Sequence, residues 1–213
     1  LIGFAGGPFT IAAYMIEGKG SNSFSKCVSF FNNYEKTFIK LLKKLEIFIS
    51  NHLIKQIEAG ADAIQIFESH AKIAVENNKF REFCIEPNNN IVKNIKKKYP
   101  YIPIIGFPRN ADSLYTEYIN DVNIDCVSID QNTNINKLID NLIINKERTI
   151  CFQGNLDPEI LLQGGNNLVN SVNDILEKFS SVNHIFNLGH GVIKETPVKN
   201  IDLLVKTIRE WKK

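Results

Sequence analysis

The sequence of 213 residues has few cysteines, few arginines and no long apolar run. Its four cysteines, Cys27, Cys84, Cys126 and Cys151, are widely separated, which argues against a CxxC redox motif or a zinc knuckle. Scattered cysteines suit a reducing compartment, so we expect a cytoplasmic protein. No apolar stretch approaches the length of a membrane-spanning helix, and no basic segment followed by an apolar one opens the chain. Neither a transmembrane helix nor a signal peptide is therefore predicted.

An excess of charge of either sign is also missing. The 25 lysines and arginines nearly balance the 23 aspartates and glutamates, and a net charge of +2 does not indicate a nucleic-acid binder. A basic run from Lys93 to Lys98 suits the last turn of a helix, where cations interact favourably with the helix dipole. The abundance of isoleucine (31), asparagine (26) and lysine is interpreted as a bias toward A/T-rich codons. With 44% hydrophobic and 23% charged residues, the composition is that of an ordinary globular protein.

Short apolar runs alternate along the chain with longer stretches of helical periodicity. The predicted strands are Leu1–Ala5, Ala63–Phe67, Ile102–Phe107, Cys126–Ile129, Thr149–Gln153 and His184–Leu188. Between the first two, apolar residues recur every three or four positions from Phe38 to Ile57, which predicts a long amphipathic helix that ends at Gly60. Alternating strands and helices of this kind predict parallel βαβ units.

Further helices are predicted around Leu114–Tyr118, Ile135–Leu142 and Leu168–Phe179. Two helix starts are explicit, because Asp157-Pro158 and Thr196-Pro197 each place a capping side chain before a proline at the first helical position. The last helix is expected to bury an apolar face made of Val198, Ile201, Leu204, Val205, Ile208 and Trp211.

Two architectures satisfy this alternation, an open doubly wound sheet and a (β/α)8 barrel. A doubly wound nucleotide binder would carry a glycine-rich phosphate turn, but Gly3–Pro8 lacks the GxGxxG spacing and Gly18–Ser21 lacks the Walker pattern. Each predicted strand is instead followed by polar or glycine residues, starting at Gly6, Glu68, Arg109, Asp130, Gly154 and Gly189. In a barrel these positions converge at the mouth where barrel enzymes act. We therefore predict an α/β fold of TIM type, with about six βα units of a (β/α)8 barrel in a single domain over residues 1–213.

Two segments near the first strands carry side chains suited to ligand binding. Tyr14 follows the first strand and turn, although a tyrosine of the core would fit this position equally well. Phe67-Glu68-Ser69-His70 ends the second strand, where alternation directs Phe67 and Ser69 to one side and Glu68 and His70 to the other. The alternatives are that Ser69 caps the next helix and that His70 is solvated.

The histidine at position 190 is the sharper candidate. It stands between Gly189 and Gly191 after an apolar strand, so it has little steric cover and is placed to meet a ligand. His52, in the middle of a helix, is interpreted as structural or exposed. No metal site is predicted, because Lys72 stands two residues after His70 and no His-x-Cys pair follows either histidine.

Together these motifs resemble the uroporphyrinogen decarboxylase family. The resemblance rests on five ordered segments, Leu1–Thr10, Tyr14–Gly18, Gly60–His70, Gln153–Pro158 and Asn187–Gly191, and runs the whole length of the chain. Some positions depart from the family pattern. Gly7 and Phe9 stand where alanine and tryptophan are common, Gln131 stands where a tryptophan is usual, and Gly106–Ala111 replaces a more glycine-rich loop.

The resemblance implies a (β/α)8 barrel without cofactor or metal, typically a cytoplasmic homodimer of haem and tetrapyrrole biosynthesis. The family removes CO2 from four acetate side chains of uroporphyrinogen III to give coproporphyrinogen III. The expected partner is therefore a tetrapyrrole substrate, and neither nucleic acid nor a membrane. By resemblance, Tyr14, Ser69 and His190 bind the tetrapyrrole and Phe67 packs against it. A pyrrole protonated at a ring carbon accepts the electrons that CO2 leaves behind, so no cofactor is needed.

The family's catalytic aspartate and substrate-binding arginines belong to a region that precedes the motif at Leu1. No catalytic residue is therefore assigned in this chain, which we interpret as the C-terminal portion of such an enzyme. We expect it alone not to decarboxylate uroporphyrinogen at an appreciable rate. Two alternatives stay open: a zinc-dependent methyltransferase of the same superfamily acting on corrinoid or thiol methyl groups, and a non-catalytic fragment that binds a tetrapyrrole.

Overall fold

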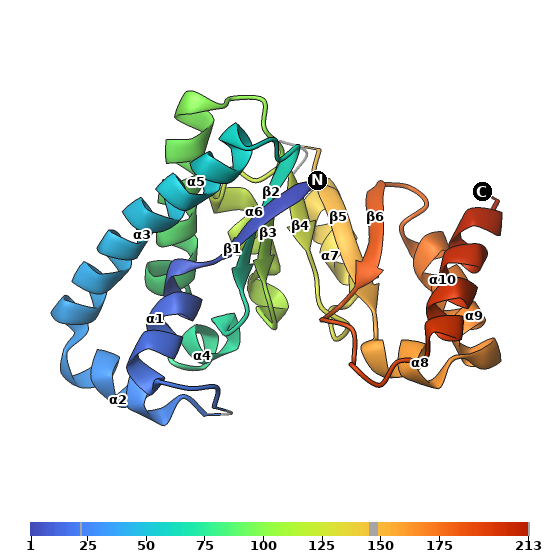
Figure 1. Cartoon of the computed structure of the whole chain (residues 1–213), viewed down its shortest axis with the longest axis horizontal. Coiled ribbons are helices and arrows are strands. Elements are labelled where there is room, and N and C mark those ends of the chain that lie inside the picture. The colour runs from blue at the N-terminus through green and yellow to red at the C-terminus, as the bar shows by residue number, and fades with distance from the viewer. Residues whose placement is uncertain (22, 145–148, 213) are drawn as a thin grey trace. The chain divides into compact units, whose positions relative to one another are not determined.

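The structure is a computed structural model that describes residues 1–21, 23–144 and 149–212. The chain divides into two compact units, Leu1–Cys126 and Val127–Lys213. Figure 1 shows the helices α1, α3 and α5 of the first unit along one side of its strands, and the helices α8, α9 and α10 of the second unit beside β6.

The strands alternate with helices along the whole chain, as predicted. They are β1 (Ile2–Gly6), β2 (Ala63–Glu68), β3 (Ile104–Pro108), β4 (Cys126–Ser128), β5 (Cys151–Leu156) and β6 (Asn183–Leu188). Their order in the sheet is β1-β2-β3-β4-β5-β6, and the pairs β1–β2, β2–β3 and β5–β6 are parallel. The predicted α/β fold with six consecutive βα units is thereby confirmed.

Some strand boundaries differ from the prediction by up to three residues. The third strand begins at Ile104 and not at Ile102, because Pro103 has no N–H to donate to a neighbouring strand. The fifth strand begins at Cys151 and continues through Gly154 to Leu156, where it pairs with β6. Cys151 and Cys126 lie inside strands and are free cysteines, as expected for small apolar side chains.

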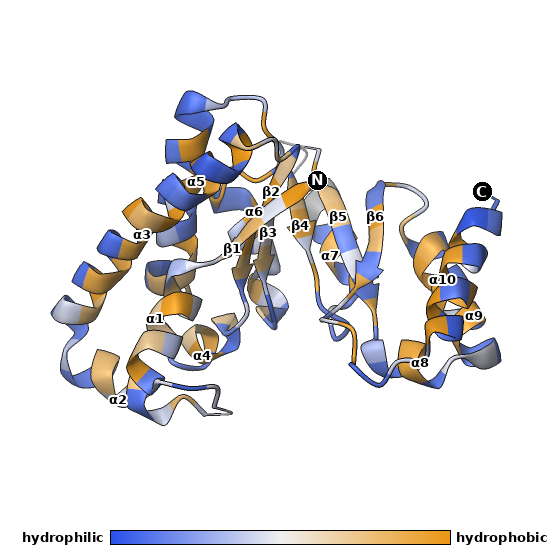
Figure 2. Ribbon diagram, in the orientation of Figure 1, coloured by the Kyte–Doolittle hydropathy of each residue, from blue (hydrophilic) through white to orange (hydrophobic). Residues whose placement is uncertain are grey.

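The helices of the first unit cover the strands with amphipathic faces. They are α1 (Pro8–Glu17), α2 (Ser25–Asn33), α3 (Glu35–Glu58), α4 (Ala71–Glu76), α5 (Glu86–Lys98) and α6 (Tyr115–Asp121), with a π-helical turn at Arg81–Ile85 and a 3₁₀ turn at Asp112–Leu114. The predicted long helix is α3, which Figure 2 colours in alternating hydrophobic and hydrophilic bands. Phe48 is an exception to the predicted face, since it is 69% exposed.

A cluster of buried phenylalanines fixes α1 in the first unit. The Phe9 ring of α1 stacks on Phe83 with ring centroids 5.8 Å apart, and Phe38 of α3 lies 4.8 Å from Phe83. Phe31 of α2 lies 5.3 Å from Phe83, and all four rings are almost fully buried. Aromatic burial on this scale is the main source of stability in a small core, so these contacts determine where α1 carries its other side chains.

The helices of the second unit follow the same plan, with α7 (Ile135–Ile144), α8 (Pro158–Gln163), α9 (Gly165–Lys178) and α10 (Val198–Glu210). The predicted start of α8 is confirmed, because the Asp157 carboxylate caps it by accepting a hydrogen bond of 2.9 Å from the Glu159 N–H. The predicted start at Thr196 is wrong by one position. Pro197 is the residue before α10, and the Thr196 N–H instead closes a turn with the Ile193 carbonyl at 2.9 Å.

The apolar face predicted for α10 is only partly correct. Val198 is 72% exposed and Val205 is 38% exposed, whereas Ile201, Leu204 and Ile208 are half-buried. The fully buried residue of this helix is polar: Asn200 donates from its amide nitrogen to the Leu161 and Leu162 carbonyls of α8, both at 2.9 Å. The first turn of α10 is thus held by hydrogen bonds to the end of α8, at a position that the apolar pattern does not include.

Candidate functional site

The carboxyl end of β2 directs alternate side chains to opposite faces. The Phe67 ring is half-buried and contacts Phe4 of β1 and Phe107 of β3, with ring centroids 5.9 and 6.0 Å apart. Glu68 points the other way, toward α1, and is fully buried. The alternation predicted for Phe67 and Glu68 is therefore present in the structure.

Glu68 holds the N-terminus of α1. Its carboxylate accepts hydrogen bonds from the Thr10 N–H at 2.9 Å, the Thr10 hydroxyl at 2.8 Å and the Phe9 N–H at 3.2 Å. Burial raises the pKa of Glu68 to about 7, although these hydrogen bonds act in the opposite direction. A negative charge at this position also suits the positive end of the helix dipole.

Gly7 is required by the same contact. A Cβ atom added at Gly7 would stand 2.2 Å from the Glu68 carboxylate, far closer than nonbonded atoms approach. A side chain at this position would therefore require the Glu68 side chain to move. Gly7 also donates its N–H to the Phe67 carbonyl at 2.8 Å, which continues the pairing of β1 and β2 into the first turn of α1.

Tyr14 lies on α1 beside the segment that follows β2. Its ring contacts His70 with centroids 5.0 Å apart, and Phe24 lies 5.4 Å from Tyr14 and 4.3 Å from His70. The Tyr14 side chain is 45% exposed, so it belongs to the surface and not to the core. Tyr14, Phe24 and His70 form what we call the aromatic triad.

His70 is half-buried within the triad, and its Nε2 atom is buried without a hydrogen-bond partner in the described part of the chain. Burial and the positive charge of Arg109 lower its pKa, which favours the neutral ring. The alternatives considered for this segment are therefore resolved: His70 is not simply solvated, and it, not Ser69, is the residue before α4, with no side-chain cap. Ser69 remains half-exposed at the end of the strand.

His190 belongs to the second unit and follows β6. The Gly189 N–H donates to the Leu156 carbonyl at 2.8 Å, so the pairing of β5 and β6 extends to the residue before it. A Cβ atom at Gly189 would lie 2.3 Å from the Gln131 backbone nitrogen, which explains the glycine. The His190 side chain is exposed, and its Nδ1 accepts a hydrogen bond from the Gly191 N–H. A neutral ring in this arrangement carries its hydrogen on Nε2, which is a hydrogen-bond donor.

Of the four residues predicted to bind substrate, the structure brings three into one region. Phe67 and Ser69 lie at the end of β2, and Tyr14 reaches their neighbour His70 from α1. His190 follows the end of its own strand in the second unit. The sequence did not predict Phe24, which enters the triad with a backbone φ of 46°, nor Thr10, which anchors Glu68. A glutamate at the end of an apolar strand needs a hydrogen-bond donor when it is buried. Glu68 was therefore the feature of the sequence that could have pointed to a partner such as Thr10.

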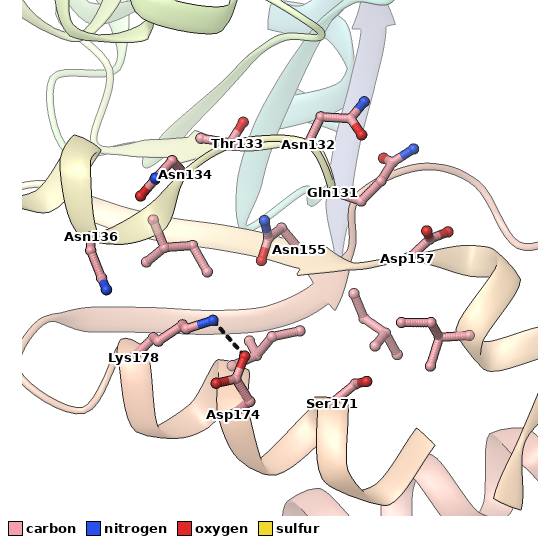
Figure 3. A pocket seen from close by; sticks show the side chains of 14 residues that line it. Gln131, Asn132, Thr133, Asn134, Asn136, Asn155, Asp157, Ser171, Asp174 and Lys178 are labelled. Atoms are coloured by element: carbon pink, nitrogen blue, oxygen red, sulfur yellow. Dashed lines mark hydrogen bonds and ion pairs between the residues drawn. The ribbon is translucent and has the colours of Figure 1, made fainter. Parts of the chain in front are cut away.

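A separate cavity of about 580 Å³ lies in the second unit. Figure 3 shows its polar lining, with Asn132, Asn134 and Asn155 among the labelled side chains and Lys178 donating to Asp174 at 2.5 Å. None of Tyr14, Phe67, Ser69 and His190 belongs to its described lining. We therefore do not count this cavity as part of the candidate site.

In the described part of the chain, no three histidine, cysteine, aspartate or glutamate side chains gather closely enough to hold a metal ion. Among the helices that the structure describes, none is long and apolar enough to cross a lipid bilayer.

The parallel strands with polar side chains at their carboxyl ends define the class of α/β proteins that bind ligands at this end of the sheet. The family model described as "Uroporphyrinogen decarboxylase (URO-D)" matches residues 1–211. The chain belongs to the uroporphyrinogen decarboxylase family.

Curated relatives agree with this assignment. The chain is 42% identical over 211 residues to the uroporphyrinogen decarboxylase of Wolbachia pipientis wMel and to that of Rickettsia bellii (strain RML369-C). Each alignment covers 99% of this chain and 60% of the relative, so the chain spans about 60% of the length of these relatives. The intracellular xylanase of Thermoanaerobacterium saccharolyticum, a solved structure, has 15% identity and a TM-score of 0.42, covering 70% of this chain and 56% of that one. Similarity at that level supports no inference about fold or function.

Proposed function

We propose that this chain takes part in the decarboxylation of uroporphyrinogen to coproporphyrinogen, without a cofactor or a metal ion. The match of residues 1–211 to the family is the observation that carries the proposal. The cysteines of the chain form no disulfide, which suits a cytoplasmic enzyme, as does the family to which the chain belongs. We propose a homodimer as the working form of the enzyme.

The arrangement of side chains supports a substrate that is both aromatic and rich in carboxylates. The rings of Phe4, Phe67 and Phe107 form an apolar row, against which a pyrrole ring can pack. Ser69, two residues after Phe67, and Tyr14, whose ring contacts His70, carry hydroxyl groups that can donate to carboxylate oxygens. His190 offers its Nε2 hydrogen to the same kind of group.

These residues bind and orient in the proposed reaction, and none is assigned as its acid. When a ring carbon of the pyrrole is protonated, the bond to the departing carboxylate can break and its electron pair neutralises the ring. The protein accelerates this step only by interactions that are stronger in the cationic transition state than in the bound substrate. Hydrogen bonds that fix the other carboxylates keep the reacting acetate in place for this step.

His190→Asn in the full-length protein tests the role of this histidine. We expect the melting temperature to change little, because the side chain is exposed. Turnover of uroporphyrinogen should fall by a moderate factor, or intermediates that keep extra carboxylates should accumulate. Separation of the products by their number of carboxylates measures both effects.

His52→Asn is the matched control, since His52 is an exposed histidine on α3. If His190→Asn unfolds the protein while the folded fraction turns over normally, His190 has a structural role. If the full-length protein neither binds nor consumes uroporphyrinogen, the proposed function itself is wrong.

A further inference from the structure

The segment after β3 begins with a cation, Arg109, at the carboxyl end of β2. β2 and β3 pair in parallel with Glu68 opposite Pro108, and the Arg109 N–H donates to the Glu68 carbonyl at 3.2 Å. This bond belongs to the pairing of Glu68 with Pro108, and it places the Arg109 backbone at the carboxyl end of β2, beside the residue that precedes Ser69. Phe67 and Phe107 contact each other across the two strands, and Ser69 and Arg109 follow them two residues later, in the turns that end β2 and β3.

The charge of Arg109 acts on the aromatic triad. After burial, this charge is the second cause that lowers the pKa of His70. His70 is also the residue whose Nε2 is buried without a partner in the described residues. With His70 neutral, Arg109 brings a permanent positive charge to the carboxyl ends of β2 and β3, where Ser69 follows β2 and the Tyr14 ring contacts His70.

Two other cations of the first unit lie away from this strand end. Arg81 forms ion pairs with Glu117 at 2.7 Å and with Asp121, which belong to α6. Lys72, on α4, pairs with Glu76 at 3.6 Å within its own helix. These pairs lie at the surface, where they contribute little. Arg109 is half-buried and directly follows β3 at this strand end.

We infer that Arg109 binds a carboxylate of the tetrapyrrole beside Ser69, and so positions the substrate against the Phe67 ring. The inference rests on the proposed function and adds a substrate-binding residue to it. A guanidinium can hold a carboxylate with two parallel hydrogen bonds, which lysine cannot reproduce. The bound negative charge would also offset the effect of Arg109 on His70, so the pKa of His70 should rise when the ligand binds.

Fluorescence titration with uroporphyrin, the air-stable oxidised form of the substrate, tests the binding in the full-length protein. Arg109→Gln should weaken binding by about ten- to a hundredfold, as for the loss of a hydrogen bond to a charged group. Arg109→Lys should weaken it less, because the charge remains. Arg81→Gln is the control, and it should leave the affinity unchanged.

NMR titration of His70 measures its pKa. Ligand binding would not change this pKa through Arg109 if Arg109 had only a structural role. In the free protein, Arg109→Gln should raise the pKa of His70, because a nearby positive charge is removed. Uroporphyrin should raise this pKa in the unsubstituted protein, and by less in Arg109→Gln. Equal affinity of Arg109→Gln and the unsubstituted protein would overturn the inference and leave the proposed function standing. A protein that binds no uroporphyrin at all would overturn both.

Discussion

At the scale of single residues, the buried carboxylate of Glu68 makes stability depend on pH. Its pKa lies at about 7 in the folded protein against an ordinary value of 4.5. Between these values the folded protein keeps a proton that the unfolded chain releases, so stability falls as the pH rises from 4.5 to 7 and then levels off. A pKa shift of this size corresponds to a loss of unfolding free energy on the order of 3 kcal/mol over this pH range.

Glu68→Gln should remove this pH-dependent loss of stability, because an amide does not ionise. In urea denaturation, the free energy of unfolding of Glu68→Gln relative to the unsubstituted protein should therefore rise between pH 4.5 and 8. Glu76→Gln, an exposed change on α4, should show no comparable trend. If Glu68→Gln and the unsubstituted protein differ by the same free energy at every pH, ionisation of Glu68 does not contribute to stability.

At the scale of secondary-structure elements, α8 and α10 are joined by a polar contact. The buried Asn200 amide donates to two carbonyls at the end of α8, and Gly164 leaves the room for it, since a Cβ atom there would lie 2.4 Å from the Asn200 Oδ1. The last carbonyls of a helix lack donors within the helix itself, so the side chain supplies what the end of α8 needs.

Asn200→Ala should lower the free energy of unfolding by about 1–3 kcal/mol, because buried carbonyls lose their donor. Asn200→Asp should cost more, since a carboxylate cannot donate and would face two carbonyl oxygens. Chemical denaturation measures both changes. Asn167→Ala, on the exposed side of α9, serves as the control. A loss as small as that of the control would mean that apolar packing alone holds α8 and α10 together.

At the scale of the whole molecule, the strand order has two ends. β1 and β6 are its first and last strands, and β1 exposes Phe4 by 62% and Ile2 by 46%. End strands with exposed apolar side chains tend to pair with other chains. We therefore expect the 213-residue chain to self-associate unless another segment covers these strands.

Phe4→Lys should reduce this association, because a charge on an end strand opposes pairing. Sedimentation velocity over a wide range of concentrations would measure it. Tyr101→Lys is the control, since Tyr101 is 94% exposed in a turn and belongs to neither end strand. A monomer at every concentration, or equal association of both variants, would contradict the expectation.

Much of the site could be predicted from local patterns. The alternation at Phe67 and Glu68 separates the two faces of β2, and the glycines at 189 and 191 indicate an exposed His190. The aromatic triad could not be predicted, because Phe24 and His70 are far apart in the sequence and Phe24 adopts a left-handed backbone conformation. The roles of Thr10 and Gly7 likewise depend on the direction in which Glu68 points.

The sequence by itself determined the alternating α/β order of this protein and its family, since apolar periodicity and ordered motifs are local properties of the chain. It also determined the start of α8, where one carboxylate caps the helix. Only the tertiary structure decided which side chains lie next to one another. The exposure of Val198, the burial of Asn200 and the hydrogen bond from Arg109 to Glu68 depend on packing and on strand register. Those are set by contacts between distant segments, which no local pattern contains.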